Sequence, residues 1–154
     1  MMDREMRVCL AASAGGHASA LLKLHRCWEG LDCFAVTTSK VLEKQFAKYG
    51  RVYVVEESNR LHPLKVLRTL AGCVRIILRE RPAVILSTGA AVGCIMALLG
   101  RSLGARIAWV DSIANTEHLS LSGRLVRPFA DLVLTQWPEV AQRHKGVEYV
   151  GYIL

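Results

Sequence analysis

Six short apolar runs rich in β-branched residues alternate along the chain with longer segments of helical period. This alternation predicts a parallel sheet built from βαβ units, because parallel strands need a helix-length crossover between them. The expected strands are 7–12, 33–38, 52–56, 83–87, 106–111 and 132–136. The expected helices are 18–28, 40–49, 63–80, 90–103, 119–129 and 138–144, and 147–154 is a last strand or a tail. The predicted fold class is α/β, a Rossmann-like parallel sheet with helices on both faces.

Length and composition favour a single folded domain. The chain has 154 residues, of which 52% are apolar and 21% are charged, and the commonest domain size is roughly 100 to 150 residues. No glycine- or serine-rich linker and no internal repeat interrupts it. Residues 1–154 are therefore predicted to form one domain, and two full catalytic domains do not fit within this length.

We expect neither a signal peptide nor a spanning helix. Residues 1–7 are charged, and the apolar run that follows them stops at Gly15. The most apolar stretch, 90–99, is closed by Gly100 and Arg101, and it is shorter than the roughly 20 residues that cross a bilayer. Any membrane contact is therefore expected to be peripheral.

The charge of the chain favours anionic partners. Lysine and arginine outnumber aspartate and glutamate by 20 to 13, a formal charge of +7, which suits phosphates, nucleic acid or an acidic membrane surface. The basic residues lack the interleaved aromatics of nucleic-acid modules, so nucleic acid is not expected. Five cysteines without a C-x-x-C pair predict a reduced, cytosolic setting. No metal-ligand spacing is present, so no metal or other cofactor is predicted.

Sheets of this class bind ligands beyond the carboxyl ends of their strands. Small, polar and glycine residues gather at those positions, which are 13–17, 38–39, 57–59, 88–90, 112–115 and Trp137. The candidate site is therefore expected at this edge.

The first of these groups resembles a phosphate cradle. Ser13, Gly15 and Gly16 lead into a helix, and paired glycines let backbone N–H groups and the positive helix end approach a diphosphate. A tight turn that needs glycine only for its geometry is the alternative. The motif is neither G-x-G-x-x-G nor a P-loop, because no lysine follows the glycines. His17 comes next, where an imidazole can accept a proton from a sugar hydroxyl or bind phosphate; an ordinary surface or core histidine is the alternative.

Two further groups follow later strands. Thr88 and Gly89 offer a hydroxyl and a second helix start to an anionic or sugar ligand, and simple N-capping is the alternative. Asp111 and Ser112 end a strand that looks buried, where a carboxylate can hold a sugar hydroxyl or orient a histidine. A helix cap or a buried structural aspartate explains Asp111 equally well.

The helix expected at 63–80 is amphipathic. Lys65, Arg68, Arg75 and Arg79 fall on one face. The opposite side is apolar and contains Val66, Leu67, Leu70, Ala71, Cys73, Val74, Ile77 and Leu78. A basic amphipathic helix of this kind can lie on anionic lipid, and a solvated face on a helix packed against the sheet is the alternative.

Several short motifs, taken in order, resemble one known family. They are Ser-Ala-Gly-Gly-His at 13–17, Ser-Thr-Gly-Ala-Ala at 87–91, Val-Asp-Ser-x-Ala-Asn at 110–115, Leu-Ser-Leu-Ser-Gly-Arg-Leu at 119–125, Pro-Phe-Ala-Asp at 128–131 and Gln-Trp-Pro-Glu at 136–139. The chain resembles the PssD/CpsF-like polysaccharide biosynthesis proteins, which are similar to the membrane-associated Alg14 subunit of the eukaryotic dolichol-linked chitobiose synthase. The resemblance covers nearly the whole chain and implies the N-terminal, acceptor-side half of a GT-B glycosyltransferase.

The resemblance also implies a function. A sugar, N-acetylglucosamine or another hexose, would pass from a UDP-sugar to a polyprenyl-diphosphate-linked acceptor at the cytoplasmic face of the membrane. A separate donor-binding subunit, PssE-like or Alg13-like, would be needed for activity. A non-catalytic membrane scaffold that recruits this subunit is the alternative.

The family's site residues carry over by motif. His17 would be the base or a diphosphate ligand, and Asp111, where the family commonly has glutamate, the alternative base or orienter. Residues expected to bind the acceptor and its diphosphate are Ser13, Gly15, Gly16, Thr88, Gly89, Ser112 and Asn115. Asn115 stands where the family often has arginine.

Overall fold

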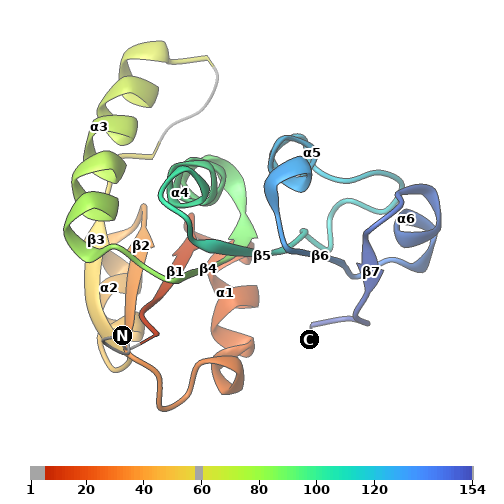
Figure 1. Ribbon diagram of the computed structural model, residues 1–154, viewed down its shortest axis with the longest axis horizontal. Helices are drawn as coiled ribbons and strands as arrows, with labels where there is room; N and C mark the ends of the chain where they lie inside the picture. Colours follow the sequence, from red (N-terminus) through yellow and green to blue (C-terminus); the bar gives the residue numbers. More distant parts are fainter. Residues whose placement is uncertain (1–5, 58–60, 154) are drawn as a thin grey trace.

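A computed structural model describes residues 6–57 and 61–153 of the chain, and its strands form one parallel sheet in the order β3-β2-β1-β4-β5-β6-β7 (Figure 1). The strands are β1 (Val8–Ala12), β2 (Cys33–Thr37), β3 (Gly50–Val54), β4 (Val84–Gly89), β5 (Arg106–Val110), β6 (Leu132–Thr135) and β7 (Glu148–Tyr149). The α-helices are α1 (Gly16–Lys23), α2 (Lys40–Phe46), α3 (Pro63–Glu80), α4 (Ala90–Ser102), α5 (Leu121–Val126) and α6 (Pro138–Arg143). Two 3₁₀ turns, η1 (His25–Cys27) and η2 (Arg127–Phe129), follow α1 and α5.

The strand order reverses between β1 and β4. The chain builds outward from β1 to β3, and α3 then returns it across the sheet to place β4 against β1. The loops after β1 and β4 therefore open side by side at the carboxyl edge, which is the switch point where such sheets bind ligands.

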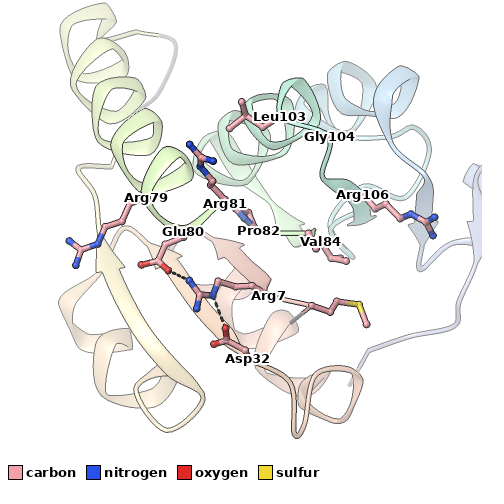
Figure 2. A pocket seen from close by; sticks show the side chains of 12 residues that line it. Arg7, Asp32, Arg79, Glu80, Arg81, Pro82, Val84, Leu103, Gly104 and Arg106 are labelled. Carbon is pink, nitrogen blue, oxygen red and sulfur yellow. Dashed lines mark hydrogen bonds and ion pairs between the residues drawn. The ribbon is translucent and has the colours of Figure 1, made fainter. Parts of the chain in front are cut away.

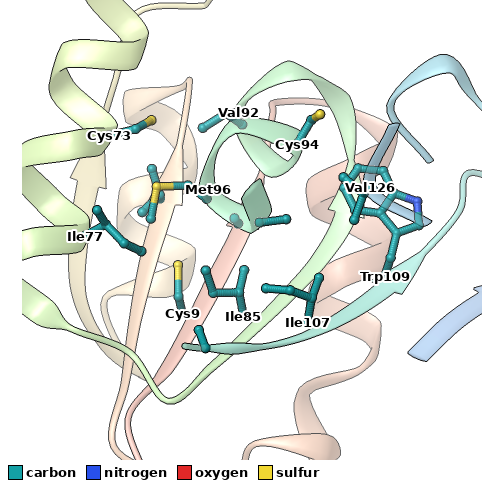
Figure 3. Packing of buried hydrophobic residues seen from close by; sticks show 14 of the residues in the cluster. Cys9, Cys73, Ile77, Ile85, Val92, Cys94, Met96, Ile107, Trp109 and Val126 are labelled. Atoms are coloured by element: carbon teal, nitrogen blue, oxygen red, sulfur yellow. The ribbon is translucent and has the colours of Figure 1, made fainter. Parts of the chain in front are cut away.

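Two apolar clusters hold the layers together. One packs α3, α4 and α5 on one face of the sheet around Ile85, Met96 and Ile107 (Figure 3). The other packs α1 and α2 on the opposite face through Leu21 and Phe46. Because helices cover both faces of β1, all five of its residues are buried, and its sequence is continuously apolar rather than alternating.

The structure confirms every predicted strand and helix and shifts several boundaries. The strand expected at 52–56 begins at Gly50, because a Cβ there would lie 1.9 Å from the Cys33 carbonyl oxygen and only glycine permits this pairing. The helices expected at 18–28 and 119–129 each divide into an α-helix and a 3₁₀ turn. In the second case Pro128 has no N–H to continue the α-helical bonds. The terminal segment forms the two-residue strand β7, and Ser58, Asn59 and Leu154 lie outside the described residues.

Within residues 6–57 and 61–153, no helix is both long and apolar enough to cross a membrane. The same residues contain no cluster of three or more His, Cys, Asp or Glu side chains that could hold a metal ion.

Candidate functional site

The start of α1 is open to solvent. Gly15 has φ +81° and caps the helix in a conformation that L side chains rarely adopt. Gly15 and Gly16 are both exposed, and a Cβ built on either would meet no atom within 4 Å. The first N–H groups of a helix have no intrahelical partner, so this end presents free donors and the positive end of the helix dipole to a ligand.

The side chain of His17, a residue of α1, reaches the end of β4. Its Nδ1 lies 2.9 Å from the carbonyl oxygen of Thr88, and the Thr88 hydroxyl donates in return to the His17 carbonyl oxygen at 2.6 Å. A carbonyl oxygen can only accept a hydrogen bond, so Nδ1 carries the proton. The neutral imidazole therefore has its free lone pair on Nε2, for which the described residues provide no hydrogen-bond partner.

Gly89 makes this position of His17 possible. A Cβ on Gly89 would lie 2.7 Å from Nδ1 and 2.8 Å from Cε1 of the ring, closer than real Cβ contacts. Gly89 also has φ +126°, and the following Ala90 has φ +66°. The turn from β4 into α4 is thus conformationally strained at the point where it supports the imidazole.

The start of α4 is covered by the protein's own side chain. Gly89 is buried beneath His17, and the Thr88 hydroxyl is committed to a backbone carbonyl. The two helix starts are therefore not equivalent. The start of α1 is open, whereas Thr88 and Gly89 hold His17 in place. The expectation that both helix starts bind one ligand stays a prediction.

A pocket of about 260 Å³ brings several of the predicted residues together at this edge. Gly16, His17, Thr88 and Ser112 line it as the sequence predicts. Its other lining residues, to which the sequence assigned no binding role, are Ser19, Ala20, Lys23, Ile113, Gln136 and Ile153. Helical spacing from Gly16 could have indicated Ser19, Ala20 and Lys23. No local signal indicates Ile153, which reaches the pocket only through the folding of the terminal segment.

Asp111 does not line this pocket. It is 1% exposed, and its Oδ1 accepts hydrogen bonds from Trp109 Nε1 at 3.1 Å and from the Ser120 hydroxyl at 2.6 Å. Its Oδ2 accepts from the Ser120 backbone N–H at 2.8 Å. Ser120 is in turn the N-cap of α5, where its oxygen accepts from Gly123 N–H. The geometry supports the structural alternative for Asp111 and shows no contact with His17.

Four further predicted residues, which are Ser13, Gly15, Gly89 and Asn115, are not part of the pocket lining. Ser13 is buried, and its hydroxyl is 3.5 Å from the Ala14 carbonyl oxygen. Asn115 is half-buried, and its backbone N–H closes a turn on the Ser112 carbonyl oxygen.

The α3 helix presents three faces. The residues it buries against the sheet and α4 are Thr69, Cys73, Ile76, Ile77 and Glu80. The predicted basic residues Lys65, Arg68, Arg75 and Arg79 are all exposed. Much of the side expected to be packed is exposed as well, with Leu67 61% and Leu78 52% accessible. Packing alone therefore accounts for only part of the apolar residues of this helix.

A larger cavity, of about 840 Å³, lies at the opposite edge of the sheet (Figure 2). Arg7 bridges Asp32 and Glu80 there, while Arg79, Arg81 and Arg106 point away from one another. These cations do not converge on one point, so this cavity is not the candidate site.

Glu80 is the buried centre of the polar network at that edge. Its carboxylate accepts hydrogen bonds from Arg7 Nη1 at 3.0 Å, from Arg51 Nη1 at 2.6 Å and from the Tyr53 hydroxyl. Burial would raise the pKa of Glu80, but the hydrogen bonds from Tyr53 and Arg51 and the charges of Arg51 and Arg7 outweigh it and lower that pKa. The network ties α3 to β3 and to Arg7, the residue before β1.

A family model described as "Oligosaccharide biosynthesis protein Alg14 like" matches residues 33–153. The chain belongs to this Alg14-like family. The UDP-N-acetylglucosamine transferase subunit alg14 of Schizosaccharomyces pombe is 32% identical over 120 aligned residues, covering 73% of this chain and 57% of that protein. The corresponding subunit of Yarrowia lipolytica is 36% identical over 177 aligned residues, covering 96% of this chain and 81% of that protein. The narrower PssD/CpsF-like resemblance stays a prediction.

Solved structures show the fold of this Alg14-like chain. MurG of Acinetobacter baumannii superposes with a TM-score of 0.74 at 15% identity, over 94% of this chain and 45% of MurG. A UDP-N-acetylglucosamine 2-epimerase superposes with a TM-score of 0.70 at 9% identity, over 94% of this chain and 47% of the epimerase. The predicted fold class is confirmed: the chain has the Rossmann-like parallel sheet that forms one half of a GT-B protein.

Proposed function

We propose that the chain is the acceptor-side subunit of a two-chain GT-B glycosyltransferase. The enzyme would transfer N-acetylglucosamine or another hexose from a UDP-sugar to a polyprenyl-diphosphate-linked acceptor. The single observation that carries this proposal is His17, whose Nδ1 is bonded to the Thr88 carbonyl oxygen and whose Nε2 is free. The names of the Alg14-like relatives, which are transferase subunits, support the reaction class.

In the proposed reaction the free Nε2 of His17 accepts the proton of the acceptor hydroxyl. General-base catalysis by a positioned side chain contributes about 10² to 10⁴ in rate. The exposed start of α1, with Gly15 and Gly16, would bind the acceptor's diphosphate through backbone N–H groups. Ser112 lines the same pocket, where its hydroxyl can contact the sugar. Asp111 would have no direct part, because both of its oxygens are already hydrogen-bonded.

The donor half would come from a second polypeptide, PssE-like or Alg13-like. The chain superposes on 45% of MurG and on 47% of an epimerase. Both matches correspond to one of the two domains of a GT-B protein, and the relatives are named as subunits. In this proposal the partner would bind the UDP-sugar, and this chain would bind the lipid acceptor.

The α3 helix would hold the subunit on the cytoplasmic face of the membrane. Leu64, Leu67, Ala71, Val74 and Leu78 follow one another at intervals of three and four residues, so they form one stripe. Each of the four predicted basic residues directly follows an apolar residue of this stripe, so the basic stripe is rotated by about 100° and adjoins it. Adjacent apolar and basic stripes on an exposed helix suit an anionic lipid surface, where each cation contributes about 1 kcal/mol.

A transfer assay tests the proposal. The chain is purified with its donor-side subunit and supplied with UDP-N-acetylglucosamine and a lipid-diphosphate sugar acceptor. His17→Ala should lower turnover at least about 10²-fold. His25→Ala is the matched control, because the one hydrogen bond of the His25 side chain within the described residues is to the Leu22 carbonyl oxygen in its own turn. Unchanged turnover in His17→Ala, with recruitment of the partner intact, would favour the non-catalytic scaffold.

Liposome flotation tests the membrane contact. Reversing the charge of Lys65, Arg68, Arg75 and Arg79 should reduce flotation with anionic vesicles and leave the weaker binding to neutral vesicles unchanged. Charge reversal at four exposed cations outside α3, which are Arg26, Lys40, Lys44 and Lys48, is the control for net charge. Flotation that falls equally in both sets, or in neither, would argue against α3 as the contact.

A further inference from the structure

The Gln-Trp-Pro-Glu motif at 136–139 is not explained by the proposed chemistry. Its first two residues, Gln136 and Trp137, lie between the end of β6 and the start of α6. Their side chains join three segments: the end of β5 with the loop after it, the β6–α6 junction, and residues 150–153. The last of these segments runs back toward α1 (Figure 1).

Gln136 makes the central connection. It is 2% exposed, its Nε2 donates to the Asp111 carbonyl oxygen at 3.2 Å, and its Oε1 accepts from the Ile153 backbone N–H at 2.9 Å. Both ends of the amide are therefore used. An aliphatic side chain in this place would leave a backbone carbonyl and a backbone N–H without their partner, which is costly in a buried site.

Trp137 makes a second connection beside the first. Its indole N–H donates to the Ile113 carbonyl oxygen at 2.7 Å. Its ring meets Tyr152 edge-on, with 5.3 Å between the ring centroids. The segment after β5 and the terminal segment are thus each held by the two neighbouring residues Gln136 and Trp137.

These connections bring residues of both held segments into the lining of the pocket. Ile113 comes from the first held segment and Ile153 from the second, and both line the pocket that contains His17 and Ser112. The pocket therefore combines apolar side chains with a free imidazole nitrogen and a hydroxyl. A pyranose ring has matching chemistry, because its C–H faces are apolar and its hydroxyl groups lie around the edge.

We propose that Gln136 is a positioning residue that holds Ile153, together with Ile113, as an apolar platform for the sugar ring of the acceptor beside His17. This inference rests on the proposed function and adds the subsite that recognises the sugar. Gln136 itself acts through the backbone of Ile153, so a change at either residue disturbs the same wall of the pocket.

Steady-state kinetics of the two-chain enzyme test this role. Gln136→Met preserves the side-chain volume and removes both hydrogen bonds, and Ile153→Ala removes the platform from a half-exposed position where folding is not at stake. Each should raise the KM for the acceptor about 10-fold while kcat and the KM for the UDP-sugar stay within about twofold. The double variant should be no worse than the more affected single variant. Gln142→Ala, an exposed residue of α6, is the matched control.

A binding measurement separates this inference from the proposed function. A water-soluble, short-chain prenyl diphosphate carrying N-acetylglucosamine is titrated into the complex without donor. Tight binding without any transfer would refute the proposed reaction alone. Transfer with an unchanged acceptor KM in folded Gln136→Met and Ile153→Ala would overturn the platform, as would a loss of donor-subunit recruitment in place of the KM effect. Absence of both binding and transfer in the wild-type complex would overturn both proposals.

Discussion

In the proposed two-chain enzyme, replacing Gly89 by alanine should lower turnover without altering any group that takes part in the proposed chemistry. The added Cβ would lie 2.7 Å from Nδ1 of His17, whereas ordinary van der Waals contact begins at 3.4 Å. The imidazole must therefore withdraw by about 0.7 Å, the difference between these two distances. Its 2.9 Å bond to the Thr88 carbonyl oxygen would lengthen or break. The ring would then lose both its position and the tautomer that leaves Nε2 free.

The expected loss follows from this displacement. A misplacement of about 1 Å in a catalytic constellation can cost about 10² in rate. Gly89→Ala should therefore lower kcat by about 10 to 10²-fold, approaching the effect of His17→Ala. In the double variant the two effects should not add, because both remove the same positioned base.

The assay is turnover of the two-chain enzyme, with thermal unfolding measured on the same samples. Alanine at φ +126° carries a backbone strain of about 1 to 3 kcal/mol, independent of His17. Gly104→Ala controls for this strain, because Gly104 has φ +87° and a Cβ there would meet no atom within 4 Å. Gly104→Ala should lower the Tm by a similar amount and leave kcat unchanged.

Full activity of folded Gly89→Ala would refute the reasoning, because the position of His17 would then be irrelevant to catalysis. Additive losses in the double variant would also contradict it, since Gly89 would have to act on the reaction by another route.

Three other outcomes follow from the structure. Glu80→Gln should destabilise the protein by about 2 kcal/mol at neutral pH, or about 4 to 8 °C in Tm, because it removes the buried negative charge that pairs with two arginines. The loss is smaller than for a fully buried ion pair, because both arginines are part-exposed. The folded state lowers the pKa of Glu80, so this stabilisation is present above the ordinary value of 4.5 and is lost as the pH falls below it. The Tm difference from wild type should therefore shrink as the pH is lowered below 4.5, and a difference independent of pH would contradict the network. Asp111→Asn should lower the Tm and leave kcat within about threefold, whereas a large loss of kcat at unchanged Tm would restore Asp111 as base or orienter. In a maleimide reaction on native protein, the exposed Cys27 should be labelled first, because burial raises the pKa of Cys73 to about 12; equal rates for these two thiols would be inconsistent with the core.

Features that depend on neighbouring residues were open to prediction from sequence. The periods of the apolar residues identify each strand and helix, because burial on one or both faces imposes a spacing of about 2 or 3.6 residues. The Gly15-Gly16-His17 turn was likewise visible, since a helix start after a strand requires little beyond its own residues. The start of β3 at Gly50 was missed, because the reason is a close approach to the Cys33 carbonyl oxygen in another strand.

The sequence by itself determined the order of elements, the edge of the sheet at which the candidate residues lie, and the residues of the glycine-rich turn. Only the tertiary structure decided which helix start is open, because His17 covers Gly89 through a contact between residues about 70 positions apart. It also decided that the carboxylate of Asp111 is buried and hydrogen-bonded to Trp109 and Ser120, that Ile153 enters the pocket, and that α3 has a third, exposed apolar face. The physical reason is the same in each case. Hydrogen-bond partners and burial depend on groups that are distant in sequence and close in space, and the local pattern of residues does not specify which groups come together.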